Sequence, residues 1–143
     1  MATRELARTP RVLPLYLRTA AALVPGASHL PGVPGAGRTI PELEITLRDA
    51  PIEPGRLRAY RELCGFARGE LVPCTFPHVL AFPLHMALMA DGRFPFGAVG
   101  LVHVQNELRQ LRPLRAEEPL SFTVSATAPE QHPRDVALER PGP

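Results

Sequence analysis

The chain has 143 residues, of which 45% are hydrophobic and 21% charged, so its length and composition suit one globular domain. All 16 basic residues are arginines scattered along the chain, and the formal net charge is only +2. A nucleic-acid-binding protein would carry a basic stripe, so we expect no nucleic-acid partner. The sequence favours no membrane-surface role either.

The cysteines and the apolar segments predict a soluble, cytoplasmic protein. Cys64 and Cys74 are too few for a disulfide framework, and we expect both to be buried free thiols in a reducing compartment. No clean signal peptide is present, because Arg18 interrupts the apolar stretch near the start. The longest apolar run, residues 79–90, is too short to span a bilayer.

The first 65 residues predict a helix, a loop, a strand and a second helix, in that order. Residues 13–24 are rich in alanine and leucine, and the proline–glycine stretch of residues 25–41 predicts a surface loop. Apolar residues at every second position in 43–47 predict a half-buried strand. A helix then begins at Pro54 and is capped by Gly65, with one apolar face: Leu57, Tyr60, Leu63 and Cys64.

The stretch TFPHVLAFPLHMALM, residues 75–89, predicts a helix buried on most sides. It is apolar nearly all round, whereas a surface helix would carry a polar face. Thr75 is a plausible cap, and Pro77 suits the first helical turn. Pro83 removes one backbone donor, so we expect either a kink there or the true start of the helix.

Two strands are expected after this helix. Residues 101–110 alternate along their length, with an apolar first half, and residues 120–126 alternate between Pro119 and Pro129. Residues 131–143 hold no run that predicts a strand or a stable helix. A buried helix followed by antiparallel strands predicts an α+β domain in which a curved sheet wraps the helix.

Three blocks of the sequence, in order, resemble the N-terminal half of the two-part MaoC-like acyl dehydratases, the (R)-specific enoyl-thioester hydratases. The blocks are YRELCGF, LVPCTFPHVLAFPLHMALM and FPFGAVGLVHVQNELRQLRPL, and the resemblance runs from about residue 13 to about residue 133. It implies a hot-dog fold, in which residues 77–90 contain the long central helix. It also divides the chain into an N-terminal helix and linker (1–41), a hot-dog domain (42–129) and an irregular tail (130–143).

The sequence departs from this family in two ways. The catalytic motif, which resembles Gly-Asp-x-Asn-Pro-x-His, is absent: Asn106 is the only asparagine, and Asp49, Asp91 and Asp135 have no asparagine two positions on. The carboxylate and imidazole that would activate water have no place in such a motif, so we expect no catalytic residue. The tail also lacks the further strands of a complete sheet, which suggests a fold that is incomplete at its C-terminus and a truncated gene product.

The resemblance implies an acyl tunnel lined by residues of the central helix and the following strand. The candidates are Phe82, Leu84, Met86, Met89 and His103. Aromatic and methionine residues at helical spacing also suit a plain core, and for Phe82, Leu84, Met86 and Met89 the two readings stay balanced. For His103 we favour a buried polar group satisfied between helix and sheet.

Other polar side chains suggest weaker sites. His78 and His85 are seven residues apart on similar helix faces, which is too far for the usual metal pair, so we expect no metal and no cofactor. A zinc site of Cys64, Cys74 and His78 lacks a second ligand pair of standard spacing. Arg109, Arg112 and Arg115 suggest contacts to coenzyme A phosphates, although a solvated strand end explains them better.

The sequence thus favours a non-catalytic half of an enoyl-coenzyme A hydratase that shapes a pocket for an acyl-coenzyme A or acyl-carrier thioester. Its expected protein partner is a second hot-dog fold, either a catalytic half or another copy. The alternatives are a structural or interaction remnant without a ligand and a one-fold thioesterase with His85 as its base.

Overall fold

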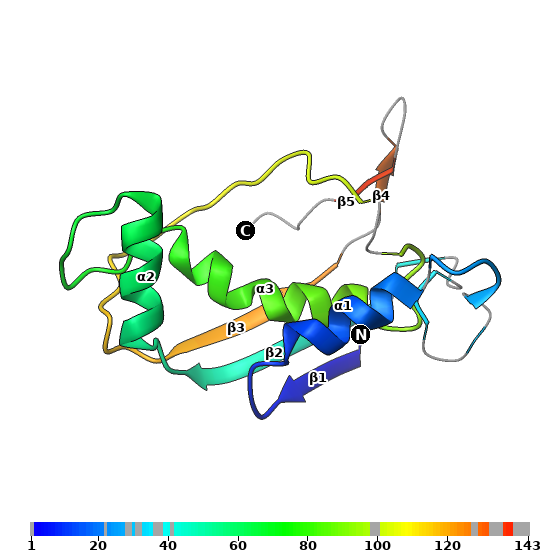
Figure 1. Cartoon of the computed structure of the whole chain (residues 1–143), viewed down its shortest axis with the longest axis horizontal. Coiled ribbons are helices and arrows are strands. Elements are labelled where there is room, and N and C mark those ends of the chain that lie inside the picture. Colours follow the sequence, from blue (N-terminus) through cyan, green and yellow to red (C-terminus); the bar gives the residue numbers. More distant parts are fainter. Residues whose placement is uncertain are drawn as a thin grey trace.

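The computed structural model is an α+β arrangement in which one long helix lies against a three-stranded mixed sheet (Figure 1). It describes residues 2–21, 23–27, 30, 33–35, 39–40, 42–97, 101–126, 129–131 and 136–138. The predicted α+β class is confirmed, and the arrangement is compatible with a hot-dog fold. Gly100, which lies inside the third block of the resemblance, and Pro133, near its C-terminal edge, lie outside the described residues.

The sheet has the strand order β1-β2-β3, formed by Ala2–Leu6, Leu43–Ala50 and Leu120–Ser125. β1 runs parallel to β2, and β2 runs antiparallel to β3, with Ile45 opposite Val124. The alternation of the sequence predicted β2 and β3. It did not predict β1, because this strand is exposed along most of its length and has no alternating apolar residues.

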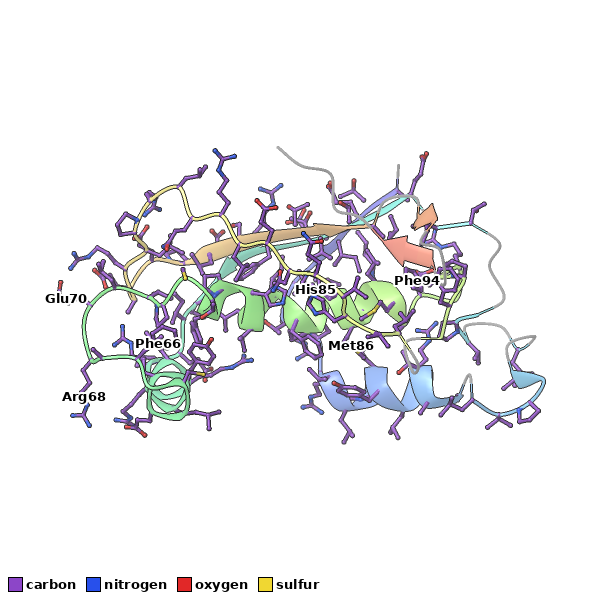
Figure 2. The ribbon with its side chains drawn as sticks, turned by 90° about the horizontal axis from the view of Figure 1, so that it is seen from above. Phe66, Arg68, Glu70, His85, Met86 and Phe94 are labelled. Atoms are coloured by element: carbon purple, nitrogen blue, oxygen red, sulfur yellow. The ribbon has the colours of Figure 1, made fainter. Side chains whose placement is uncertain are left out.

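The three predicted helices are present as α1 (Val12–Ala21), α2 (Pro54–Cys64) and α3 (Phe76–Met89). Gly65 caps α2 in the left-handed region, with a φ of 72°, and its N–H donates to the carbonyl of Arg61. α3 continues through Pro83 as one helix and lies between the sheet and α1 (Figures 1 and 2). It is buried over most of its surface, as its composition predicts.

The core consists of two clusters that meet beneath α3. The larger cluster joins α3 to the sheet and contains Leu43, Ile45, Leu47, Leu84, Leu88, Phe94 and Val124. The smaller cluster joins α2 to the start of α3 and contains Ile52, Leu57, Val72, Phe76 and Leu80. The alternate residues of β2 thus point at one face of α3, which fixes how the helix lies on the sheet.

α2 is buried over a shorter part of its length than the sequence predicts. Leu57 is buried and Tyr60 half-buried, but Leu63 is 86% exposed, and Cys64 and Cys74 are both exposed. The prediction of buried thiols is therefore wrong. α2 packs only through its first two turns, so the side chains of its last turn lie beyond the core.

The prediction of a strand at residues 101–110 is also wrong. These residues form neither helix nor strand, and all of them are exposed. Alternation alone does not make a strand, because a strand also needs a neighbour for its backbone hydrogen bonds, and the described residues supply none here.

The tail differs from its prediction as well. β4 (Pro129–Gln131) pairs antiparallel with β5 (Val136–Leu138) in a separate two-stranded sheet. The sequence predicts an irregular segment there, because a three-residue strand is too short to show a period of two. Neither strand joins the three-stranded sheet.

Candidate functional site

Four side chains that are not fully buried form a stripe along one side of α3, and one of them, Met89, also packs against the larger core cluster. They are His78, Phe82, His85 and Met89, and their spacing of four, three and four residues places them on one side of a helix. Phe82 is 37% exposed and the other three are half-buried, whereas Leu84 on the opposite face is fully buried. We call these four residues the α3 stripe.

The two histidines of the α3 stripe lie close together. Their ring centroids are 5.4 Å apart and their planes are inclined by 46°. The sequence predicted that they share a face, and the structure confirms it. The α3 stripe therefore combines imidazole nitrogens, which donate or accept hydrogen bonds, with the apolar side chains of Phe82 and Met89. This mixture can bind a ligand that has both a polar group and an apolar chain.

The structure places the five candidates for the acyl tunnel in different environments. Phe82 and Met89 lie together on the α3 stripe, but Leu84 and Met86 are only 0% and 3% exposed and belong to the interior. Figure 2 shows Met86 and His85 halfway along α3. A ligand would reach Leu84 only if the core opened.

His103 is not the buried polar group that we favoured in the sequence. It lies in the exposed segment 101–110, and its Nε2–H donates to the carbonyl of Gln105 over 2.7 Å. The structure does not place it on the α3 stripe. The sequence patterns predict no ligand contact for His78 and His85, although their helical spacing to Phe82 and Met89 places all four on one side of α3.

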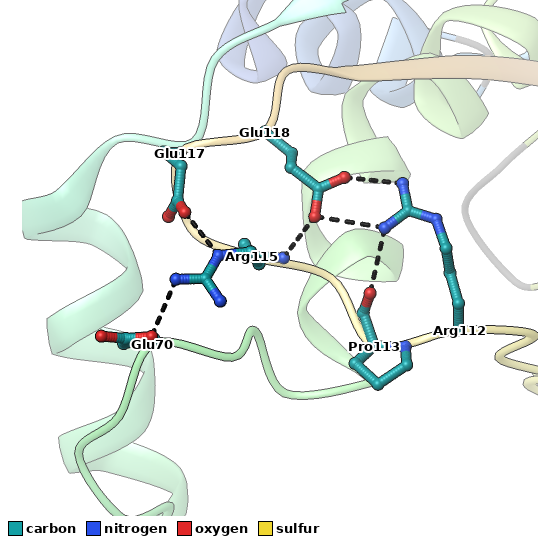
Figure 3. Close-up of polar contacts among 6 residues, drawn as sticks. All are labelled: Glu70, Arg112, Pro113, Arg115, Glu117 and Glu118. Atoms are coloured by element: carbon teal, nitrogen blue, oxygen red, sulfur yellow. Dashed lines mark hydrogen bonds and ion pairs between the residues drawn. The ribbon is translucent and has the colours of Figure 1, made fainter.

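Two of the three candidate phosphate-binding arginines are engaged in ion pairs (Figure 3). Arg112 bonds both carboxylate oxygens of Glu118, at 3.1 and 2.6 Å, and Arg115 bonds Glu117 at 2.6 Å and Glu70 at 2.8 Å. Hydrogen bonding to Arg112, and to the backbone N–H of Arg115, lowers the pKa of Glu118 to about 2. An incoming phosphate would have to displace these carboxylates, so the structure favours a local structural role for both arginines.

These ion pairs accompany backbone bonds that join two loops. The N–H of Val72 donates to the carbonyl of Leu114 over 2.8 Å, and the N–H of Ala116 donates to the carbonyl of Glu70 over 3.1 Å. We call this region, residues 70–72 with 112–118, the loop clasp. It fixes the position at which the exposed segment 101–110 rejoins the body of the molecule.

No metal centre is indicated by the residues that the structure describes. Among them, no three histidine, cysteine, aspartate or glutamate side chains are grouped closely enough to hold an ion. Over the same residues, no helix is long and apolar enough to cross a bilayer.

Comparison with known proteins gives one informative similarity. Over 113 residues, or 79% of its length, the chain is 33% identical to the 3-hydroxyacyl-thioester dehydratase X of Mycobacterium tuberculosis. This similarity supports a relationship to the acyl dehydratases. The chain spans 40% of the length of that relative. No family model and no solved structure matches the chain.

Proposed function

We propose that this chain is a non-catalytic, acyl-thioester-binding half of an acyl dehydratase in fatty-acid metabolism. The observation that carries the proposal is its similarity to a 3-hydroxyacyl-thioester dehydratase over most of its length, together with the absence of the hydratase motif from its sequence. In this function, water is added across a trans-2-enoyl thioester, or removed from the 3-hydroxyacyl product, in a second hot-dog fold. This chain contributes part of the surface that holds the acyl chain.

The α3 stripe is the surface that we assign to the ligand. A thioester carries a polar carbonyl beside a long apolar chain, and the α3 stripe offers matching groups within one helix face. The imidazoles of His78 and His85 supply hydrogen-bonding nitrogens, and Phe82 supplies the most exposed apolar surface. Phe82 and Met89 are retained from the sequence-based candidates. Leu84 and Met86 support the helix from the interior.

Binding of acyl-coenzyme A to the purified chain tests this assignment. Calorimetric titration with a series of saturated acyl chains should give affinities that increase with chain length, because each added methylene buries more apolar surface. Phe82→Ser should weaken binding about tenfold, which corresponds to the loss of part of one buried aromatic contact. Leu63→Ser is the matched control, because Leu63 is 86% exposed on α2, away from the α3 stripe. Equal affinities in the two variants would contradict the assignment.

A function without any ligand is the second candidate, and the exposed segment 101–110 favours it. An interaction protein needs an accessible surface but no thioester site. In the titration, it would show no chain-length dependence. A one-fold thioesterase has less support, since α3 contains no acidic residue that could orient His85 as a base.

A further inference from the structure

The side of α1 that faces away from α3 is apolar, although it is exposed to solvent. α1 packs on α3, and Thr19 is the fully buried residue on its inner side. Figure 2 shows α1, drawn in blue, at the edge of the molecule. Four exposed residues at spacings of three, one and three lie along its outer side: Leu13, Tyr16, Leu17 and Ala20. We call these four residues the α1 face.

The exposed apolar surface is extensive and continues beyond the end of α1. Leu13 and Leu17 are 70% and 65% exposed, and Leu23 and Val24, which follow the helix, are 62% and 59% exposed. α1 itself contains no acidic residue. Neighbouring apolar side chains that a folded domain leaves in water mark a surface that binds something.

Positive charge is concentrated in the same part of the chain. Residues 1–24 contain one acidic residue, Glu5, and four arginines: Arg4, Arg8, Arg11 and Arg18. The other residues hold twelve of the 16 basic residues and 13 of the 14 acidic ones, so they carry a slight negative charge. Glu5 is already engaged in an ion pair with Arg48, and Arg8 and Arg11, just before α1, are exposed. The surroundings of the α1 face are therefore positively charged.

An apolar helix face beside arginines suits the surface of an anionic bilayer. Such a face enters the boundary between headgroups and acyl chains to a depth of about 5–10 Å. The guanidinium groups then meet lipid phosphates, with which they form charge-assisted hydrogen bonds. α1 has ten residues and is too short to cross a bilayer, so it would lie along the surface.

We propose that the α1 face, together with Leu23, Val24 and the arginines before the helix, docks this protein on an anionic membrane surface. The sequence as a whole favours no such role, because its arginines are spread along the chain. The structure adds that the apolar residues beside four of those arginines stay in solvent. The inference goes beyond the proposed function and does not depend on it, because acyl-coenzyme A is titrated without vesicles.

Co-sedimentation with vesicles tests the docking. The whole chain should pellet with mixed phosphatidylglycerol and phosphatidylcholine vesicles and stay in solution with phosphatidylcholine alone. Leu17→Ser should lower the partition coefficient about tenfold, because it removes one inserted apolar side chain. Leu63→Ser, at a position on α2 that is 86% exposed, is the matched control and should leave it unchanged. Equal losses in the two variants, or no binding by the wild type, would overturn the proposal.

The electrostatic part of the docking has its own readout. Arg8→Gln and Arg11→Gln should each weaken binding to anionic vesicles about fivefold at low ionic strength. Raising the ionic strength from about 0.1 M to about 1 M shortens the screening length from about 10 Å to about 3 Å, so the effect of both variants should nearly vanish. Binding that neither the variants nor salt changes would contradict the role of the arginines.

An introduced tryptophan tests which surface meets the lipid. The chain contains no tryptophan, so a single one reports only its own surroundings. Leu17→Trp should shift its emission to shorter wavelength with anionic vesicles and be quenched by brominated acyl chains, whereas Leu63→Trp should do neither. Both positions are exposed, so circular dichroism and thermal unfolding should match the wild type. A Leu17→Trp signal that vesicles leave unchanged would refute membrane docking and favour a protein partner for the α1 face.

Discussion

Several side chains in this protein hold loop backbone in position through hydrogen bonds. Arg61 at the end of α2 donates from Nη1 to the carbonyl of Gly69 over 2.6 Å and from Nη2 to the carbonyl of Leu71. It therefore holds the loop that follows α2 and, through that loop, one side of the clasp. Tyr60 makes a comparable link, because its hydroxyl lies 2.7 Å from that of Thr75 just before α3. Neither role is visible in the sequence, since both depend on residues brought together by the loop.

Asp49 has a backbone conformation that restricts which residues fit there. Its φ is 50°, at the irregularity in the pairing of β2 with β3, and its N–H donates to Oγ of Ser121. Aspartate and asparagine tolerate this left-handed region, whereas a β-branched residue does not. We expect Asp49→Val to lower the free energy of unfolding by about 1–2 kcal/mol and Asp49→Asn to leave it nearly unchanged. Urea denaturation measures both, and equal effects would show that the backbone is not strained.

Glu118 should make the stability of the clasp dependent on pH in the acidic range. Its pKa is lowered from 4.5 to about 2 by Arg112 and by the N–H of Arg115, so folding favours its charged form. The stabilisation is therefore fully present above pH 4.5 and is lost as the pH falls towards 2. Glu118→Gln should be less stable than the wild type at neutral pH, and the difference should shrink over this range.

Thermal unfolding at a series of pH values checks this prediction. Glu62→Gln removes one exposed carboxylate from α2 and controls for the change in net charge. A difference between wild type and Glu118→Gln that stays constant across the acidic range would show that the ion pair does not contribute to folding.

At the scale of elements, α3 is central to the molecule because its different sides have different neighbours. One side packs on β2 and β3 through Leu84 and Leu88, α1 lies on the side away from the sheet, and the α3 stripe runs along a side that contains none of the buried residues. A sequence that is apolar all round gives no sign of this division, because half-buried and buried positions have similar composition. Only the arrangement of the neighbouring elements decides which apolar residues stay accessible.

Leu84 should be a sensitive position of α3. It is fully buried and packs in the cluster that joins the helix to the sheet. Leu84→Ala removes buried methyl groups and leaves a cavity, so we expect a loss of about 2–5 kcal/mol in the free energy of unfolding. Leu63→Ala, at a position that is 86% exposed, should change it by less than about 0.5 kcal/mol. Denaturant titration of both variants provides the comparison, and similar losses would contradict the assigned core.

At the scale of the whole molecule, the three-stranded sheet leaves open edges. β1 and β3 are the outer strands, and the described chain places no further strand beside either of them. Open edges are sites of pairing between chains. Together with the exposed segment 101–110, these edges leave backbone groups of the described residues without a strand partner.

The whole chain should not hydrate an enoyl thioester when it is alone. The reaction needs a carboxylate and an imidazole placed on one water molecule, and their loss costs a factor of roughly 10² to 10⁴ in rate. We therefore expect no hydration of crotonyl-coenzyme A by the purified chain, and hydration only when a separately expressed catalytic half is added. Turnover by the chain alone that is abolished by His85→Ala or His103→Ala would contradict this prediction and favour a one-fold enzyme.

The sequence by itself determined the elements whose signals are local. The alternation of β2 and β3, the proline and glycine that bound α2, and the apolar composition of α3 each reflect interactions within a few residues, and all of these elements are present. The resemblance to acyl dehydratases also came from short blocks of sequence, and the similarity to a curated dehydratase supports it.

Only the tertiary structure decided which residues are accessible and which strands have partners. It exposed Cys64 and Cys74, placed Leu84 and Met86 in the interior and brought the rings of His78 and His85 together on the side of α3 that carries Phe82. It also left residues 101–110 without a strand partner and added β1, whose own sequence carries no alternation. The physical reason is that burial and strand pairing depend on a second element, which is distant in the chain and which a local pattern cannot specify.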